Sequence, residues 1–198
     1  MADFISEIIQ PVRYNPAKGL SMNKITPPNP DEYASYYAGY VERANAKGDV
    51  FAALSQQVNE LQTALGSLSD EQGLFRDAPN EWSIKEVVGH LNDVERVFSY
   101  RLLRISRNDP APLTGFEQND YVREAGFDNY PLQDLLQEFE YLRRANILAV
   151  NNMSEEAVLR KGTASGYTVS VRALIYMMVG HVDHHMASLQ EKYLPPLQ

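Results

Sequence analysis

The four histidines are the residues whose type and spacing indicate chemistry. His181 and His185 are four residues apart in a predicted helix, so their imidazoles lie on one helix face, one turn from each other. That spacing allows two imidazoles to bind one metal ion. His90 lies on or beside the apolar stripe of another predicted helix, so three imidazoles can converge inside a helical bundle. We expect His184 to face water.

The heights of the histidines along their helices agree with a shared site. At about 1.5 Å per residue, His90 lies about 10 Å from the start of its predicted helix, and His181 and His185 lie about 10 to 17 Å from the end of theirs. Antiparallel packing would bring them level. A glycine, Gly89 or Gly180, precedes each group, although Gly inside a helix costs about 1 kcal/mol relative to Ala. A close approach of the two helices there would offset that cost.

Other interpretations of the histidines stay open at this point. A His pair at four-residue spacing also occurs on solvated helices, and an inward His can be a hydrogen-bonded core residue. Two kinds of metal enzyme are excluded. A zinc protease needs Glu after the first His, but Val182 follows His181. A di-iron bundle needs Glu three residues before each His, but Val87 precedes His90 and Val182 precedes His185 at that spacing.

Four helices are predicted to position the histidines. Apolar residues recur at spacings of three and four, and there is no convincing run of the two-residue alternation that is typical of a strand. The predicted helices cover residues 49–65, 83–105, 131–151 and 168–192. Ser83 and Glu86 form a capping box at the start of the second helix, and Thr168 or Ser170 caps the fourth.

The fold class follows from the apolar stripes of these helices. Each helix has one apolar face, which in the third includes Leu135, Phe139 and Leu148, and each face must be buried against neighbouring helices. The chain is therefore expected to be all-α, a four-helix bundle. The connections are about 17 to 23 residues long, which is more than adjacent antiparallel helices need, so a crossover order of helices is permitted.

Composition bounds the class of protein and its domains. The chain has 198 residues, of which 44% are hydrophobic and 22% charged, and no apolar segment approaches the length of a membrane span. We expect an extended arm over residues 1–30, which contain five prolines, and one bundle domain over residues 31–198. The N-terminus lacks the basic stretch and apolar core of a signal peptide, which predicts a cytoplasmic protein.

Charge and cysteine content restrict the partners. A net charge of −8 and a pI near 5.0 argue against nucleic acid, because binding to phosphates relies on clustered Lys and Arg. The chain has no Cys, which excludes disulfides, thiolate metal sites and a cysteine nucleophile. Any thiol chemistry here must therefore use a thiol from outside the protein.

Several motifs together carry a resemblance to a known family. They are, in chain order, the segment 82–90 (WSIKEVVGH), Glu95-Arg96, Gly115-Phe116, and Gly180-His181 with His184-His185. Over about residues 27–194 the chain resembles the DinB-like superfamily of four-helix metalloproteins. The resemblance implies an up-down-down-up bundle with three His ligands, which here would be His90, His181 and His185. It implies no DNA binding, in agreement with the acidic composition.

The resemblance also implies a class of reaction. Members of the family include thiol S-transferases and a thiol-dependent isomerase, which use low-molecular-weight thiols such as bacillithiol or mycothiol. Our leading hypothesis is transfer of such a thiol to an electrophilic small molecule, dependent on a divalent transition metal ion, which can be nickel, zinc or iron. A hydrolase that uses metal-activated water and a non-catalytic bundle that the metal stabilises are the alternatives. Relatives often form dimers, which implies a homodimer.

Other polar residues are candidates for roles near the metal. Asp93, three residues after His90, and Glu95 are candidate catalytic bases or partners of a ligand imidazole. Arg101, three turns from His90 on nearly the same helix face, and Arg104 are candidates for binding an anionic group of the substrate. Charged groups on a solvated helix surface are the competing interpretation for all four.

The surroundings of the site are also predicted. The connection over residues 108–130 is the longest, and we expect it to cover the entrance of the site. Trp82 and Phe116 are expected to pack the ends of the bundle rather than to stack on a ligand, and Glu86 is expected only to cap its helix.

Overall fold

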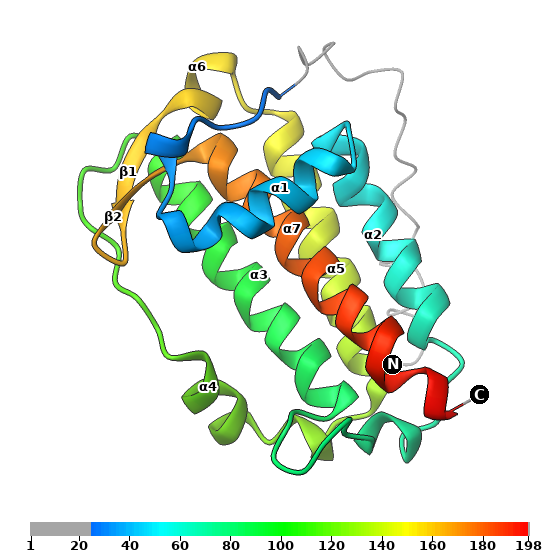
Figure 1. Ribbon diagram of the computed structural model, residues 1–198. Helices are drawn as coiled ribbons and strands as arrows, with labels where there is room; N and C mark the ends of the chain where they lie inside the picture. The colour runs from blue at the N-terminus through cyan, green and yellow to red at the C-terminus, as the bar shows by residue number, and fades with distance from the viewer. Residues whose placement is uncertain (1–24, 198) are drawn as a thin grey trace, which may run out of the picture.

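Four long helices form the bundle in the computed structural model, which describes residues 25–197 (Figure 1). They are α2 (Val50–Leu65), α3 (Ile84–Ser106), α5 (Leu132–Asn151) and α7 (Val171–Ser188). The side chains of Asp49, Ser83 and Ser170 each accept a hydrogen bond from a backbone N–H of the first turn of α2, α3 and α7. The predicted helices and their caps are confirmed, with Ser170 as the cap of the last helix.

The helices follow the predicted up-down-down-up order. Each of α2 and α3 packs against both α5 and α7, so the consecutive helices α2 and α3 lie diagonally across the bundle, which accounts for the long connections. Helices α3 and α5 run parallel. The hydrogen bonds between them show this, because the residue numbers rise together along both helices, at Asn92–Leu135, Glu95–Arg143 and Ser99–Asn146. The all-α bundle fold expected from the apolar stripes is therefore confirmed.

Shorter elements surround the bundle. They are α1 (Ala38–Ala46), α4 (Gln118–Ala125), α6 (Glu155–Leu159) and the strands β1 (Lys161–Ala164) and β2 (Tyr167–Ser170). The two strands form an antiparallel hairpin whose turn residues, Ser165 and Gly166, both have positive φ, as a tight two-residue hairpin turn requires. The sequence analysis found no strand, because four-residue strands are too short to show an alternation.

The core is divided into two apolar halves by a buried polar layer. One half lies toward the hairpin and includes Phe98 and Leu174, and the other lies toward α4 and includes Leu91 and Leu135. The buried polar residues between them are Gln57, His90, Glu95, Arg143 and His181. This layer crosses all four bundle helices.

Two details of the predicted packing are wrong. Leu148 is 46% exposed, because Arg143 and Asn146 take positions on the buried face of α5 and turn Leu148 outward. Ile25 was assigned to an unpacked arm, but its side chain is buried and its carbonyl oxygen accepts a hydrogen bond from the Tyr176 hydroxyl at 3.1 Å. The remainder of that arm, residues 1–24, lies outside the described residues.

The two glycines beside the histidines were expected to let α3 and α7 approach closely. This prediction is wrong, because each glycine contacts a different element. A Cβ atom on Gly180 would lie 1.9 Å from the carbonyl oxygen of Tyr40, so Gly180 allows the backbone of α1 to cross close to α7. A Cβ atom on Gly89 would lie 2.3 Å from the ring of Phe127. Each glycine therefore admits a different neighbour, outside the interface between α3 and α7.

Candidate metal centre

The starts of α3 and α7 set the positions of the histidines along the bundle. Ser83 Oγ accepts a hydrogen bond from the backbone N–H of Glu86 at 3.0 Å, and Glu86 Oε2 accepts one from the N–H of Ser83 at 2.9 Å. This reciprocal cap fixes the first turn of α3, so that His90 follows two turns later. Helix α7 runs antiparallel to α3 and brings His181 to the same level.

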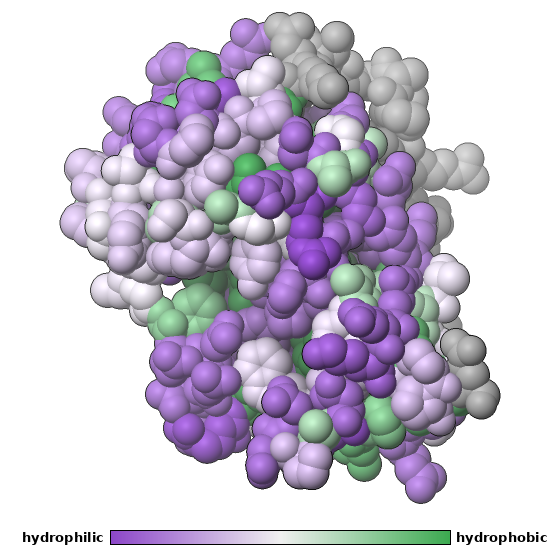
Figure 2. All heavy atoms as spheres, viewed as in Figure 1, coloured by the Kyte–Doolittle hydropathy of each residue, from purple (hydrophilic) through white to green (hydrophobic). Residues whose placement is uncertain are grey.

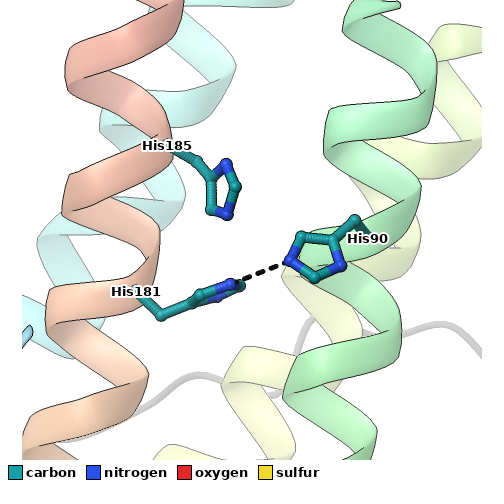
Figure 3. Close-up of side chains that lie close together, drawn as sticks. All are labelled: His90, His181 and His185. Carbon is teal, nitrogen blue, oxygen red and sulfur yellow. Dashed lines mark hydrogen bonds between the residues drawn. The ribbon is translucent and has the colours of Figure 1, made fainter. Parts of the chain in front are cut away.

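The three imidazoles of His90, His181 and His185 point toward one another in the space between α3 and α7 (Figure 3). The Nε2 atoms of His90 and His181 lie 3.0 Å apart, and one ring nitrogen from each of the three residues lies within 4.8 Å of the others. Within residues 25–197 this is the one group of three metal-ligating side chains that meet in this way. His184 is exposed and does not join it.

Burial keeps the three imidazoles neutral. It lowers the pKa of His90 to about 4. The pKa of His185 falls to about 3, first because of burial and then because His90 and His184 are close. Burial also lowers the pKa of His181 well below its ordinary value, with further contributions from the neighbouring histidines and Arg143. Near pH 7 each ring therefore has a free lone pair, which is the form that binds metal ions.

Aromatic side chains cover the histidines. The ring of Trp82 lies 4.8 Å from that of His90 and is stacked at 6.5 Å from that of His185. The ring of Tyr40 lies edge-on to His181 at 5.5 Å. Trp82 packs against the apolar half of the core toward α4, as expected, and its ring also lies beside two of the three imidazoles. These rings form aromatic walls beside the imidazoles.

A first cavity, which we call the polar cavity, opens beside His185. Its volume is about 330 Å³, and most of its lining is hydrogen-bonding side chains. They include Asn80, Glu81, Gln118, Asn119, His184 and Ser188. Trp82 also lines this cavity, so a molecule bound there would contact the indole and His185 together.

A second cavity, which we call the aromatic cavity, opens beside His181. Its volume is about 360 Å³, and its lining includes Tyr37, Tyr40, Phe98, Phe116 and Arg101. On the face shown in Figure 2, hydrophobic residues lie in a hollow between the hairpin end of the molecule and α4. Gln118, at the start of α4, lines both cavities, and the group of imidazoles borders the polar cavity through His185 and the aromatic cavity through His181.

The connection over residues 108–130 lines the site as predicted. Residues from Gly115 to Asn119 contribute to the two cavities, and α4 lies beside the start of α3. Phe116 packs against the apolar half of the core toward the hairpin, and it also forms part of the wall of the aromatic cavity. The connection is therefore a wall of the site rather than a plain loop.

The two candidate bases lie apart from the three imidazoles. Glu95 is 2% exposed, and its two oxygens accept hydrogen bonds from Arg143 Nε at 2.7 Å and Arg143 Nη2 at 2.9 Å. Asp93 is half-buried, which raises its pKa, and its nearest charges are those of Arg96 and Glu138. Neither carboxylate lines a cavity or joins the cluster of histidines in the described part of the chain.

The two candidate arginines differ from each other. Arg101 is buried and lines the aromatic cavity together with His181. Arg104 forms an ion pair with Asp109 and also contacts the Tyr100 hydroxyl, at the surface of α3. The structure therefore places Arg101 at the site and Arg104 away from it.

Sequence reasoning missed two residues that shape the site. Arg143 is fully buried next to the histidine layer, and its signal was present as a charged residue one turn after Phe139 on an apolar helix face. Tyr40 covers His181 and lines the aromatic cavity, but it comes from α1, which the sequence analysis did not predict. No pattern within the sequence connects Tyr40 with residues so distant along the chain.

Two solved structures resemble this fold. YfiT from Bacillus subtilis, reported as a probable metal-dependent hydrolase with an unusual four-helix bundle topology, superimposes with a TM-score of 0.70 and 14% identity, over 77% of this chain and 88% of YfiT. The mycothiol-dependent maleylpyruvate isomerase superimposes with a TM-score of 0.60 and 14% identity, over 71% of this chain and 59% of the isomerase. This chain thus spans less than two thirds of the isomerase, and at this identity both likenesses show the fold.

The sequence itself matches one family model. No curated protein matches this sequence. In residues 25–197 no helix is both long and apolar enough to cross a membrane. The model of the DinB superfamily matches residues 53–189, which include all four bundle helices or most of each, and the three histidines that meet between α3 and α7. The chain belongs to the DinB superfamily.

Proposed function

We propose that this chain is a metal-dependent enzyme that transfers a low-molecular-weight thiol to an electrophilic small molecule. In this proposal His90, His181 and His185 hold one divalent transition metal ion. The observation that carries the proposal is that the group of three neutral imidazoles borders two cavities of different chemistry, one through His185 and the other through His181. A transfer reaction has two substrates, and this arrangement offers a separate space to each of them.

The donor set fits a metal ion. The Nε2 atoms of His90 and His181 face each other at 3.0 Å, a separation that two nitrogen ligands of one ion can adopt when each is about 2.0 to 2.1 Å from it. The low pKa values of the rings favour the neutral form that a metal requires. Imidazole accepts nickel, zinc and iron, so these ligands do not select among the three.

The three ligands leave the charge of the ion uncompensated, because none of them is a carboxylate or a thiolate. Held by these three residues, a divalent ion would lower the pKa of a thiol or of water. The chain's own residues would then orient the reactants. Trp82 and Tyr40 pack beside the imidazoles, and the side chains of the polar cavity can hydrogen-bond a hydrophilic thiol.

The aromatic cavity suits the electrophile. Its walls are mostly rings, which bind apolar groups and keep them close to His181. The thiol and the electrophile would therefore approach the imidazoles from the two sides, and the reacting atoms would meet between them. This arrangement also agrees with the likeness to a mycothiol-dependent isomerase.

A hydrolase is the second candidate function, and the description of YfiT favours it. Hydrolysis commonly uses a carboxylate or His base near the attacking water. Asp93 and Glu95 do not supply one at the imidazoles, since Glu95 is held by Arg143 and Asp93 lies near Arg96 and Glu138. Glu81 and His184 line the polar cavity together with His185, so a base for hydrolysis is present there, and the dependence of turnover on a thiol separates the two reactions. A non-catalytic metal-stabilised bundle is the third candidate.

The metal ligands can be tested first. Purified protein should contain about one divalent transition metal ion per chain, measured by elemental mass spectrometry. His181→Ala or His185→Ala should abolish binding, whereas the matched control His184→Ala should retain most of it. Equal loss in all three variants would contradict the assignment of the ligands.

The reaction can then be tested with panels of thiols and electrophiles, with and without a chelator. Thiol transfer predicts turnover that requires both thiol and metal, and a change in the absorption spectrum of the cobalt-loaded protein when thiol is added alone. Turnover without any thiol would favour the hydrolase. If metal is bound and neither reaction occurs across the panels, the non-catalytic function replaces both.

Two further proposals concern the setting of the protein. A free thiol substrate persists in a reducing compartment, so the proposed function places the chain in the cytoplasm. We also propose a homodimer, which sedimentation at micromolar concentration would test, with a monomer contradicting it. The small-molecule chemistry of the two cavities and the net charge of −8 offer no role to nucleic acid.

A further inference from the structure

Arg101 is a buried cation without a carboxylate partner. It is 3% exposed, and its Nη2 atom donates hydrogen bonds to the carbonyl oxygen of Thr114 at 3.1 Å and to Ser165 Oγ at 2.9 Å. Two other well-covered arginines each pair with a carboxylate, Arg143 with Glu95 and Arg172 with Glu32. No ion pair within residues 25–197 involves Arg101. Buried charges are normally paired, so its positive charge is left for another group.

The position of Arg101 indicates where that group would come from. Arg101 lines the aromatic cavity, and the same cavity reaches His181. Glu117 also lines it, but this residue is exposed and its Oε1 caps the start of α4 by accepting a hydrogen bond from the Asn119 N–H at 3.2 Å. The nearest acidic side chain of the cavity is therefore engaged elsewhere, and the charge of Arg101 faces a space that a ligand can fill.

The guanidinium is held in place while part of it stays available. Thr114 belongs to the connection that precedes α4, and Ser165 is in the turn of the hairpin, so both walls of the cavity fix Nη2. Among the described residues Nε and Nη1 of Arg101 donate no hydrogen bond. An anion in the cavity can accept from these two atoms without displacing either protein partner.

Distances along α3 give the shape of the ligand. His90 and Arg101 are separated by eleven residues, which is about 16 Å along a helix. Val94 and Phe98 lie between them on the same face and line the cavity. A molecule that reaches from the imidazoles to Arg101 must therefore be elongated, with an apolar or aromatic middle.

We propose that the aromatic cavity binds an elongated anion whose carboxylate or phosphate is held by Arg101 and whose apolar middle lies against Phe98 and Tyr37. The position of its reacting end, beside His181, rests on the proposed function. Arg101 fixes the opposite end, so it determines which electrophiles are accepted. The substrate class is thus an aryl or long-chain acid rather than a neutral apolar molecule.

Binding to the metal-free protein tests this proposal separately from the metal site. The probes are 4-phenylbutyrate, its neutral amide 4-phenylbutyramide, and phenyl phosphate, each titrated by calorimetry in the presence of a chelator, which prevents direct binding of the anions to a metal. We expect the carboxylate or the phosphate to bind at least tenfold more tightly than the amide. The stronger of the two anions distinguishes a carboxylic acid substrate from a phosphate ester.

Variants test whether the preference for the anion depends on Arg101. Arg101→Gln should remove the preference for the anion, Arg101→Lys should retain part of it, and the matched control Arg104→Gln on the surface of the same helix should leave it unchanged. Circular dichroism checks that each variant is folded. Affinities of the wild-type protein for both anions that are no higher than that for the amide would overturn the proposal, and this comparison stands even if Arg101→Gln does not fold. A preference for the anion that persists in Arg101→Gln would also overturn the proposal.

The outcomes for this site and for the proposed function are distinct. If the wild-type protein holds no metal but still prefers the anion at Arg101, the anion site stands and the proposed function fails. If the protein holds one metal ion per chain and shows no such preference, the metal site stands and the assignment of the substrate class fails.

Discussion

The bundle contains two buried polar clusters in the same layer, and they are built in opposite ways. In the arginine cluster, made of Arg143, Glu95, Gln57 and Asn146, Arg143 donates to Glu95 twice and to Gln57 Oε1 at 2.8 Å, and Asn146 donates to Glu95 at 2.8 Å. The histidine cluster, made of His90, His181 and His185, brings together three groups of one kind, and it borders two cavities.

The hydrogen-bond partners separate a polar cluster that is satisfied within the protein from one that is open to a ligand. The arginine cluster connects all four bundle helices and satisfies its own charges, so it has nothing left to offer a ligand. The histidine cluster brings one ring nitrogen from each of its three imidazoles within 4.8 Å of the others. Glu95 and His90 lie on the same helix, less than two turns apart, so burial alone does not separate the two roles.

The two clusters also interact. The positive charge of Arg143 contributes to lowering the pKa of His181, after the larger effects of burial and the neighbouring histidines. The arginine cluster thus helps to keep an imidazole in the neutral form that a metal requires. A structural cluster next to a site can influence its charge without touching a ligand.

The largest loss of stability is expected at the arginine cluster. Arg143→Met should lower the free energy of unfolding by about 3 to 5 kcal/mol, because it leaves the buried carboxylate of Glu95 unpaired. Urea denaturation in the presence of a chelator measures this without a contribution from metal. The double variant Arg143→Met with Glu95→Leu should recover most of the loss. A single variant as stable as the wild-type protein would show that this cluster is not a structural one.

The histidine cluster was predictable from sequence, and the arginine cluster was not. The four-residue spacing of His181 and His185 and the heights along two helices are local quantities that a sequence contains. Arg143 was passed over because the apolar stripe of its helix was drawn through Leu142 and Leu148 instead. Placing it requires knowing that Glu95 lies opposite, which depends on the packing of α3 beside α5.

The same limit applies to the fold and to the walls of the site. The four bundle helices and the cap at Ser83 followed from periodicity and local motifs, whereas the connection lengths only permitted a crossover order and the family resemblance implied the up-down-down-up order. Helix α1 and the hairpin are short elements that owe their stability to contacts with α3 and α7, so their own sequences indicate them poorly. Consequently the sequence did not predict that Tyr40 and Ser165 line the aromatic cavity.

The next largest effect is expected where α1 crosses α7. Gly180→Ala should destabilise the protein by about 3 kcal/mol, because the new methyl group would lie 1.9 Å from the backbone oxygen of Tyr40 and α1 would have to move. Gly39→Ala is the matched control, since no atom lies within 4 Å of a Cβ there and the substitution favours a helix. Thermal denaturation of both variants compares them. Equal stability of the Gly180 and Gly39 variants would contradict the tight crossing.

A smaller and pH-dependent effect is expected at Glu32, which anchors the segment before α1 to α7. The hydrogen bonds from Arg172 are the main reason why the pKa of Glu32 falls from 4.5 to about 2, with Ser170 and Asn29 contributing. A depressed pKa means that the carboxylate stabilises the fold above pH 4.5, and that this contribution is lost as the pH falls toward 2. Glu32→Gln should therefore cost about 2 kcal/mol at pH 7 and little at pH 2.

Denaturation midpoints of the wild-type protein and Glu32→Gln across pH 2 to 7 measure this difference. Asp31→Asn is a suitable control, because Asp31 is exposed and pairs only with Lys161 at the surface. A stability difference that does not shrink on acidification would mean that packing, and not the charge of Glu32, is responsible.

The smallest change in the metal-free protein is expected at the histidine cluster. His185→Ala should alter the free energy of unfolding by less than about 1 kcal/mol, because the side chain borders the polar cavity and its removal enlarges an existing space. Removal of the imidazole also removes the free-energy cost of burying this polar ring, a burial that its low pKa indicates. With a metal ion at a thousandfold excess over its dissociation constant, however, the wild-type protein should gain about 4 kcal/mol, and His185→Ala should gain none.

Urea denaturation of the wild-type protein, His185→Ala and the control His184→Ala, each with chelator and with metal, separates these contributions. A functional cluster predicts that metal dependence disappears in His185→Ala and persists in His184→Ala, while the three metal-free stabilities stay close together. If His185→Ala instead loses several kcal/mol in the presence of chelator, the imidazoles stabilise the bundle by themselves. The histidine cluster would then stabilise the metal-free fold as the arginine cluster does. That result would contradict the distinction between the two clusters.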